Sequence, residues 1–516
     1  MTPHAPSICV VGAGPGGLAS AVLLAASGAR VTIYERQPHI GGRTGRVTLD
    51  TPLGPFHFDR GPTFFLMPFV LEEILAAAGR RLTDAAHLTR LDPMYRLSVG
   101  DPAPTNPGPD TVIDCTQDPR GMRDQLDALA PGDGDAFEAF IRENRAKLAA
   151  FTPILRRPFT GPLDALRPDM LRALPSLHPF ESVADQLARR FRHRVSRLAL
   201  SFQSKYLGMS PSDCPSLFTI LPFIEHEFGV WHPRGGCHAL MLALADTARA
   251  LGVRIETGRP IPAVEFEGSR AVGVRLDGPS GPVARHDHVV LNADAAHALR
   301  TLVPEALRPP TLSDSTLEAK RYSCSTFMLY LALRGRLDLP HHTIRISSRY
   351  EQNLDDITRG RLSDDPSLYV CNPAATDPTL APHGCSALYV LVPTPNLKAG
   401  DPGWSNGSAR ALRERALDRV SALVGRDVRS LIIGERSLSP LDWEADGIQF
   451  GATFNLAHNL GQMLHLRPQH RVPGLDGLWL VGGGTHPGSG LPVIFLSAQI
   501  TSRLLAQEAG LKSVAA

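Results

Sequence analysis

Three glycines and one carboxylate near the N-terminus have the types and spacing of a phosphate-binding site. In ICVVGAGPGGLASAVLLAASGARVTIYER, residues 8–36, Gly12, Gly14 and Gly17 form a Gly-x-Gly-x-x-Gly pattern. Glu35 follows this pattern about 20 residues later. Gly12 suits a tight turn, Gly14 lets the backbone approach a pyrophosphate, and Gly17 lets a helix pack closely on a strand. Helix amides would hold the phosphates, and Glu35 would accept hydrogen bonds from ribose hydroxyls. The pattern predicts a bound adenine dinucleotide.

The elements that must position these residues form a βαβ unit. Hydrophobic periodicity predicts a buried strand over Ser7 to Val11, a helix over Leu18 to Ser27 and a second strand over Arg30 to Tyr34. A secretion signal would begin with positive charge, which residues 1–7 lack. A membrane-spanning helix would not contain Pro15 and four glycines.

Composition indicates a soluble protein of more than one domain. The chain has 516 residues, and at about 150 residues per domain it would hold roughly three compact units or two larger ones. Charged residues make up 20% and hydrophobic residues 43%. The 53 basic residues nearly balance the 51 acidic ones, which argues against general nucleic-acid binding.

The cysteines indicate neither a disulfide framework nor a metal site. All seven are scattered, and none forms a Cys-x-x-Cys pair. We therefore expect no metal and a reducing cytoplasm as the setting.

Two further glycine-rich stretches complete the pattern. In GGRTGRVTLDTPLGPFHFDRGPTFFLMP, residues 41–68, Arg43 follows two glycines and could place a bidentate guanidinium against a pyrophosphate. In GLWLVGGGTHPGSGLPVIFLSAQITSRLL, residues 477–505, a buried strand precedes a glycine-rich loop and a helix that begins near Pro492. Between them, residues 229–297 contain an amphipathic helix from about His238 to Leu251 followed by short strands.

These motifs resemble a known family. The paired glycine motifs followed by FHFDRGPT resemble the FAD-binding start of flavin amine oxidases and, more narrowly, of bacterial-type phytoene desaturases. The segment GGGTHPGSGLP is close to the GAGTHPGAGIP form expected of carotenoid desaturases. The resemblance implies that the C-terminal segment returns to cover the flavin, and that a residue in the strand after the amphipathic helix, here Ile261, touches the adenine through its backbone. The cofactor-binding residues implied are Gly12, Ala13, Gly14, Gly16, Gly17, Glu35, Arg36, Gly42, Arg43, Gly61, Pro62, Thr63, Ile261, Asn292, Gly484, Thr485, Gly490, Leu491 and Pro492.

The resemblance also implies the architecture. We expect an α/β fold with a discontinuous Rossmann-like FAD-binding domain, made of residues 1–95, 225–300 and 470–516. A mixed α+β substrate domain would comprise residues 96–224 and 301–469, and it would include a helical part that faces a membrane.

A basic, partly apolar segment predicts this membrane contact. Residues 145–197 contain 11 Lys and Arg against 4 Asp and Glu. The longer segment from Phe137 to Leu207 reads as helices that end at prolines, namely Pro153, Pro158, Pro162, Pro168, Pro175 and Pro179. Such charges among apolar side chains suit a surface that lies on anionic lipid, although a solvated helical face would look the same. We expect a cytoplasmic, peripherally membrane-associated protein.

The function implied is FAD-dependent desaturation of a linear carotenoid precursor. The substrate would be a phytoene-like forty-carbon chain or a diapophytoene or squalene-derived thirty-carbon chain, with oxygen or a quinone as electron acceptor. A later-step carotenoid oxidase, ketolase or isomerase of the same family is the enzymatic alternative, and a prenyl-binding escort protein of the same fold is the non-enzymatic one. His232, His341, His342 and His486 could handle a proton or only bind backbone, so the catalytic residues stay open.

Overall fold

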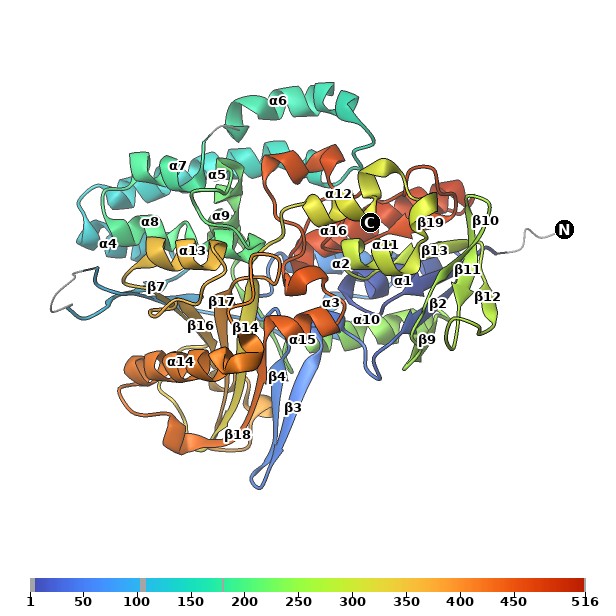
Figure 1. Cartoon of the computed structure of the whole chain (residues 1–516). Coiled ribbons are helices and arrows are strands. Elements are labelled where there is room, and N and C mark those ends of the chain that lie inside the picture. Colours follow the sequence, from blue (N-terminus) through green and yellow to red (C-terminus); the bar gives the residue numbers. More distant parts are fainter. Residues whose placement is uncertain (1–4, 103–107, 179–180, 515–516) are drawn as a thin grey trace.

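The computed structural model describes residues 5–102, 108–178 and 181–514 and shows two main sheets and a helical part (Figure 1). The first sheet is parallel, in the order β19-β13-β1-β2-β9. Its strands are mostly buried, hydrophobic runs, as expected of a parallel sheet covered on both faces. Their bounds are Ser7–Val11 (β1), Arg30–Glu35 (β2), Arg254–Thr257 (β9), His288–Leu291 (β13) and Leu478–Leu480 (β19).

Helices cover one face of this sheet and a small antiparallel sheet covers the other. Helix α1 packs against α10 and α16, and α2 packs on α16. These helices are Pro15–Ala26 (α1), Pro68–Ala77 (α2), Leu82–Ala85 (α3), His238–Ala250 (α10) and Leu491–Glu508 (α16). The opposite face carries β10 (Val264–Glu267), β11 (Arg270–Arg275) and β12 (Val283–Arg285). The predicted βαβ unit and the helices near residues 238 and 492 are confirmed.

The second sheet has seven strands in the order β18-β14-β17-β16-β15-β6-β7, antiparallel except for the β15-β6 pair. Helix α14 (Ser408–Val424) packs on one face, and the β3-β4 hairpin (Arg46–Thr51 and Gly54–Asp59) packs on the other. The strands are Tyr95–Val99 (β6), Thr111–Cys115 (β7), Ser325–Leu333 (β14), His342–Ile346 (β15), Leu368–Cys371 (β16), Ser386–Thr394 (β17) and Ile432–Leu438 (β18).

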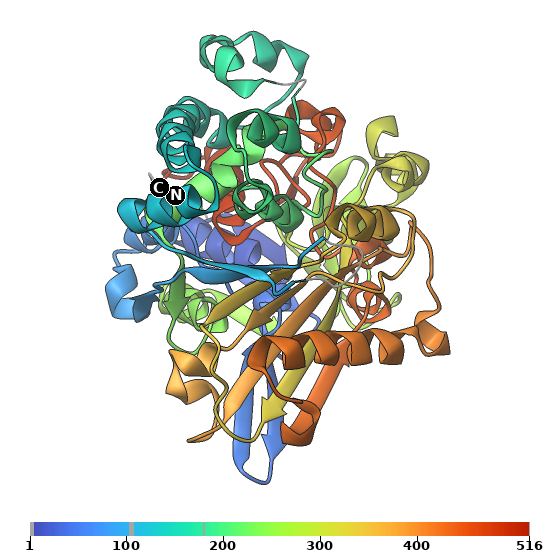
Figure 2. The same ribbon diagram turned by 90° about the vertical axis from the view of Figure 1, so that its left-hand side faces the viewer.

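A helical part lies against the seven-stranded sheet, with α6 at its outer edge (Figure 2). It comprises Pro119–Leu129 (α4), Asp133–Leu155 (α5), Pro168–Leu177 (α6), Val183–Arg190 (α7), Arg194–Ala199 (α8) and Ile220–Phe228 (α9). The remaining elements are Leu88–Arg90 (β5), Trp231–Pro233 (β8), Ala295–Leu302 (α11), Asp314–Ala319 (α12), Tyr350–Thr358 (α13) and Pro440–Ala445 (α15).

Two sequence expectations differ from this arrangement. The boundary placed at residue 225 falls inside α9, which packs on α5. Pro153 and Pro175 lie inside α5 and α6 instead of ending them. Each proline is close to the last turn of its helix, so the backbone hydrogen bond that it removes is followed by few further helical residues. Pro179 lies outside the described residues. Among the described helices, none has both the length and the apolar character needed to cross a bilayer.

Candidate functional site

At two of the N-terminal glycines, a side chain would clash with neighbouring backbone atoms. Gly12 has a φ of 102°, and a Cβ there would lie 2.5 Å from the carbonyl oxygen of Asn292. A Cβ on Gly17 would lie 2.2 Å from the carbonyl oxygen of Gly12. Gly14 caps α1, whose first turn therefore presents backbone N–H groups at the loop. The structure thus gives Gly12 and Gly17 the tight turn and the close packing that the sequence predicts.

Asn292 connects this loop to the C-terminal one. It follows β13, and its Nδ2 donates to the carbonyl oxygen of Gly12 at 3.0 Å. Its Oδ1 would lie 2.6 Å from a Cβ on Gly16 and 3.3 Å from one on Gly482. The Asn292 side chain therefore limits the space for a side chain at glycines from both ends of the chain. Ala13, in the N-terminal loop, is fully buried.

Glu35 is buried at the carboxyl end of β2. One carboxylate oxygen accepts the Ala13 N–H at 2.7 Å, and the other accepts the Gln37 N–H at 2.9 Å. A carboxylate oxygen can accept two hydrogen bonds, so Glu35 retains acceptor capacity for a ribose hydroxyl.

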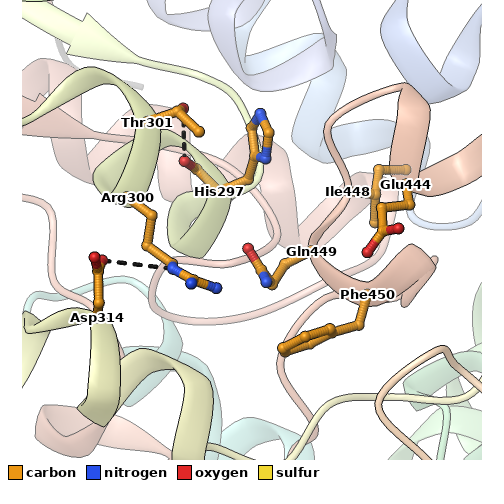
Figure 3. A pocket seen from close by; sticks show the side chains of 8 residues that line it. All are labelled: His297, Arg300, Thr301, Asp314, Glu444, Ile448, Gln449 and Phe450. Carbon is orange, nitrogen blue, oxygen red and sulfur yellow. Dashed lines mark hydrogen bonds and ion pairs between the residues drawn. The ribbon is translucent and has the colours of Figure 1, made fainter. Parts of the chain in front are cut away.

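Arg36 is exposed and lies close to a polar cavity of about 310 Å³ (Figure 3). A Cβ on Gly447 would approach both the Arg36 guanidinium and the His297 imidazole, which lines the cavity. Arg300 also lines it and forms an ion pair of 3.4 Å with Asp314. The cavity adjoins α11, which follows β13 in the chain.

Arg43 and the strap of residues 60–64 form the next part of the site. The Arg43 guanidinium donates to the carbonyl oxygen of Thr453 at 2.6 Å, and burial lowers its pKa. Gly42 has a φ of 54°, and a Cβ on Gly61 would lie 2.6 Å from the Arg43 carbonyl oxygen. The strap, which includes Pro62, is therefore packed directly against Arg43.

Three tyrosines of the second sheet hold this strap. Tyr330 donates to the Arg60 carbonyl oxygen at 2.6 Å, and Tyr389 donates to that of Gly61 at 2.8 Å. The Tyr369 hydroxyl lies 2.6 Å from Oγ1 of Thr63. The seven-stranded sheet thus fixes the position of residues that the sequence assigns to the cofactor.

The C-terminal loop is buried around an arginine that the sequence does not single out. Arg467 is only 1% exposed and donates to the carbonyl oxygens of Gly483 at 2.7 Å and Thr485 at 3.3 Å. Burial lowers its pKa to about 10, so it carries its charge at neutral pH. The side-chain oxygen of Thr485 is buried and has no hydrogen-bond partner among the described residues.

This loop ends in the N-terminus of α16. Gly490 caps the helix with a φ of 104°, and Leu491 and Pro492 form its first turn. A Cβ on Gly484 would lie 2.9 Å from that of Ala295, which begins α11. The two glycine-rich loops and the N-termini of α1 and α16 therefore surround Asn292, an arrangement that fits a dinucleotide with phosphates near one loop and a ring near the other.

The expectation for Ile261 needs a correction. Ile261 lies in the loop between β9 and β10, not in a strand. Its side chain is partly buried against the core that includes Tyr34 and Val264. Pro260 and Pro262 flank it, and prolines cannot donate the backbone hydrogen bonds that a strand ladder requires.

The four candidate histidines occupy two places. Nε2 of His486 lies 3.0 Å from the carbonyl oxygen of Arg157, and burial lowers its pKa to about 4. His232, His341 and His342 lie together, with the His232 and His341 rings 4.5 Å apart and those of His341 and His342 4.4 Å apart. His232 contacts Asp377 at 3.2 Å. The sequence analysis named these three histidines as candidates but did not predict that they lie together.

Asp59 and Lys205 are partly buried ionisable groups that the sequence analysis missed. Asp59 accepts the backbone N–H groups of Cys237 and His238 at the start of α10, and burial raises its pKa to about 6. Nζ of Lys205 is buried over the Tyr350 ring, and this burial lowers the lysine pKa to about 8. Asp59 stands in the FHFDRGPT motif, which was a usable signal, whereas Lys205 stands in no motif.

Comparisons with known proteins agree with this geometry. Residues 15–506 match the family model described as flavin containing amine oxidoreductase. The chain is 41% identical to a 4,4'-diapophytoene desaturase (4,4'-diapolycopene-forming) of Methylomonas sp. over 97% of this chain and 95% of that protein. It is 39% identical to an all-trans-zeta-carotene desaturase of Myxococcus xanthus over 98% of this chain and 94% of that protein.

Solved structures share the fold at low sequence identity. Cyclohexylamine oxidase from Brevibacterium oxydans superposes with a TM-score of 0.60 at 15% identity, covering 98% of this chain and 99% of that one. A Rab GDI from Plasmodium falciparum gives a TM-score of 0.52 at 11% identity, covering 84% of this chain and 88% of that one. These likenesses show the fold alone.

Proposed function

The chain belongs to the family of flavin-containing amine oxidoreductases, and we propose that it is an FAD-dependent desaturase of a linear carotenoid precursor. The observation that carries this proposal is the similarity to carotenoid desaturases along nearly the whole chain, which includes both glycine-rich loops. The prediction of a carotenoid-desaturase-type oxidoreductase is confirmed at this level. Whether the substrate chain has thirty or forty carbons is part of the proposal and is decided by the expression experiment below.

FAD is the proposed form of the flavin. The Gly12 loop and Glu35 form one end of the site, and the loop before α16 forms the other. A dinucleotide has both a pyrophosphate and a ribose for the first end, in addition to the flavin ring for the second. Bound flavin supplies a hydride acceptor for the carbon pair that is desaturated.

The chain's own residues must bind a hydrocarbon and exclude water. Apolar side chains that are only partly buried pack against the largest core where the strap meets the helical part. A substrate without hydrogen-bonding groups requires such a lining and few polar contacts. The candidate lining residues are Phe64, Met67, Phe218, Leu221, Phe228 and Met463.

We also propose that the protein lies on the cytoplasmic face of a membrane, through η2 (Pro162–Leu166) and α6. Leu163 is 76% exposed, Leu166 is 65% exposed and Leu171 is 50% exposed, and α6 stands at the outer edge of the molecule (Figures 1 and 2). Exposed leucines grouped in one short segment suit insertion among lipid headgroups. A membrane location would give access to an apolar substrate and to a quinone, with oxygen as the alternative electron acceptor.

The basic side chains contribute less to this proposal than the sequence suggests. Arg156 is paired with Glu73 at 2.8 Å and Arg157 with Asp169 at 3.1 Å, while Arg189 and Arg190 pair with Glu181 and Glu143. Several apolar residues of the same segment belong to the core: Phe151, Ile154, Phe159 and Met170. The proposed contact therefore rests on the exposed leucines.

Co-sedimentation with anionic liposomes tests the membrane contact. The triple variant Leu163→Ser, Leu166→Ser, Leu171→Ser should remain in the supernatant. The control variant Leu53→Ser, Leu441→Ser, Leu460→Ser changes leucines of 38–47% exposure elsewhere and should sediment like the unchanged protein. Equal sedimentation of both variants would remove the proposal.

Expression in two pigment-forming hosts tests the reaction. One host makes phytoene and the other makes diapophytoene, and extracted products are identified by absorption and mass. A longer conjugated polyene in one host alone establishes desaturation and selects the chain length. Unchanged extracts from both, with flavin present on the purified protein, would instead favour the later-step oxidase, ketolase or isomerase. Purified protein without flavin would favour the escort protein.

A further inference from the structure

A buried group of three metal-ligand side chains lies in the seven-stranded sheet. His341 is 5% exposed, His342 is fully buried and Cys371 is 1% exposed. Each offers one ligand atom, and these atoms all lie within 4.8 Å of one another. His342 and Cys371 are directly opposite each other on β15 and β16, and His341 immediately precedes β15. Sheet pairing therefore joins two residues that are 29 positions apart in the sequence.

The hydrogen bonds of the two imidazoles leave one nitrogen free on each ring. Nδ1 of His341 lies 2.9 Å from Oγ1 of Thr376, and Nδ1 of His342 lies 2.7 Å from the hydroxyl of Tyr369. Both Nε2 atoms are buried without a hydrogen-bond partner among the described residues. A hydroxyl that accepts the Nδ1–H fixes the tautomer whose Nε2 lone pair is available, as outer hydrogen bonds do in metal sites.

Two unpartnered imidazole nitrogens in a buried position need an explanation. A buried polar atom without a partner costs free energy, and such atoms usually mark a bound ion, a bound water or a functional role. Phe64 stacks on the His342 ring at a centroid distance of 4.2 Å, so an aromatic ring closes one side of the group. A thiol and two imidazoles are the donor types that zinc prefers.

We propose that His341, His342 and Cys371 bind one Zn²⁺ ion through two imidazole nitrogens and a thiolate. Metal bonds of about 2.0 Å to nitrogen and 2.3 Å to sulfur would draw the three donors together through small side-chain rotations. The Cys371 thiol releases its proton to solvent when the Zn–S bond forms. The ion would connect β15 to β16 beside the Phe64 strap, and three protein ligands leave a fourth position for water or another donor. This departs from the sequence expectation of no metal, which considered only local cysteine spacing.

Metal analysis of the flavin-loaded protein tests the proposal. The protein is purified without chelators and its zinc is measured by mass spectrometry, with about one ion per chain expected. After the zinc is removed, Co²⁺ is titrated in, and a thiolate-to-cobalt charge-transfer band is expected at about one equivalent. Zinc below about a tenth of an ion per chain together with no thiolate band would overturn the site.

Variants assign the ligands. Cys371→Ser and His342→Asn should each weaken zinc binding at least tenfold and, for Cys371→Ser, abolish the charge-transfer band. Cys385→Ser changes another buried cysteine of the same core and should leave both readouts unchanged. Flavin content shows whether each variant is folded, and the cobalt titration of the unchanged protein decides the question if a ligand variant does not fold. A charge-transfer band that persists in folded Cys371→Ser would refute the assignment.

Discussion

The carboxylate of Glu35 accepts the backbone N–H of Ala13 at 2.7 Å, which joins the end of β2 to the glycine loop after β1. Replacing Glu35 with Ala removes this hydrogen bond and the one from Gln37. The variant also loses the carboxylate that would accept a ribose hydroxyl of FAD. Hydrogen bonds to charged groups are worth about 1.5 to 3 kcal/mol, so FAD binding should weaken roughly 10- to 100-fold. Glu35→Gln keeps one acceptor oxygen and should bind FAD with intermediate affinity. Flavin titration followed by fluorescence measures both, and an unchanged affinity in Glu35→Ala would exclude the ribose role.

Gly17→Ala should remove flavin from the protein. The added Cβ would lie 2.2 Å from the Gly12 carbonyl oxygen and 2.7 Å from Nδ2 of Asn292, so the loop must move. Gly161→Ala is the matched control, because its Cβ meets nothing within 4 Å and its φ of −176° suits any residue. Flavin absorbance per chain of the purified variants decides the matter. A full flavin content in Gly17→Ala would show that the close approach is not required.

The sequence predicts the N-terminal βαβ unit well because its signals are local. Gly12, Gly17 and Glu35 stand at fixed offsets along one βαβ unit, so their spacing alone defines their geometry. The donor set of His342 and Cys371 depends on strand register, which no local pattern encodes. The pairing of Arg189 with Glu181 likewise depends on tertiary packing. The sequence therefore showed the excess of basic residues in this segment but not the acidic partners that they have in the structure.

Two lysines with enclosed ammonium groups should respond differently to the same substitution. Burial lowers the pKa of both Lys205 and Lys147 to about 8. Nζ of Lys205 has no hydrogen-bond partner among the described residues, whereas Nζ of Lys147 donates to Ser216 and Thr219. Lys205→Met should therefore raise the free energy of unfolding at pH 7 by about 1 to 3 kcal/mol, since it removes a buried charge that no hydrogen bond compensates.

Lys147→Met is the control for this prediction. It relieves a similar burial cost but removes the two hydrogen bonds that Nζ of Lys147 donates, to the Ser216 carbonyl oxygen and to Oγ1 of Thr219. Its free energy of unfolding should be lower than that of Lys205→Met by about 1 to 3 kcal/mol. Urea unfolding at pH 7 measures both, and the reverse order would contradict the account of Lys205.

Acidification from pH 7 to 5 should destabilise the fold through buried neutral histidines. Burial lowers the pKa of His226 to about 4, below the value near 6.5 expected in the unfolded chain. Between these values the unfolded state binds more protons, so the free energy of unfolding falls as pH falls, by up to about 1.4 kcal/mol per pH unit for each such histidine. His226→Gln should show a shallower dependence in urea unfolding at several pH values. An identical slope would mean that His226 does not titrate on unfolding.

Arg467 should stabilise the C-terminal loop more than any surface ion pair does. Its guanidinium donates to four carbonyl oxygens, those of Leu456, Ala457, Gly483 and Thr485. Arg467→Met leaves all four without this donor and should lower the free energy of unfolding by about 3 kcal/mol or more, with loss of flavin because two of the carbonyls belong to the loop before α16.

Two further variants distinguish geometry from charge at this position. Arg467→Lys keeps the positive charge but replaces the five-donor fork with a compact ammonium, so its stability should lie between those of Arg467→Met and the unchanged protein. Arg471 is four residues away, half exposed and paired with Asp476 and Glu508, so Arg471→Met should change stability by less than about 1 kcal/mol. Urea unfolding and flavin content measure all three variants. If Arg467→Met retained its flavin and lost no more stability than Arg471→Met, the loop would not depend on the buried guanidinium.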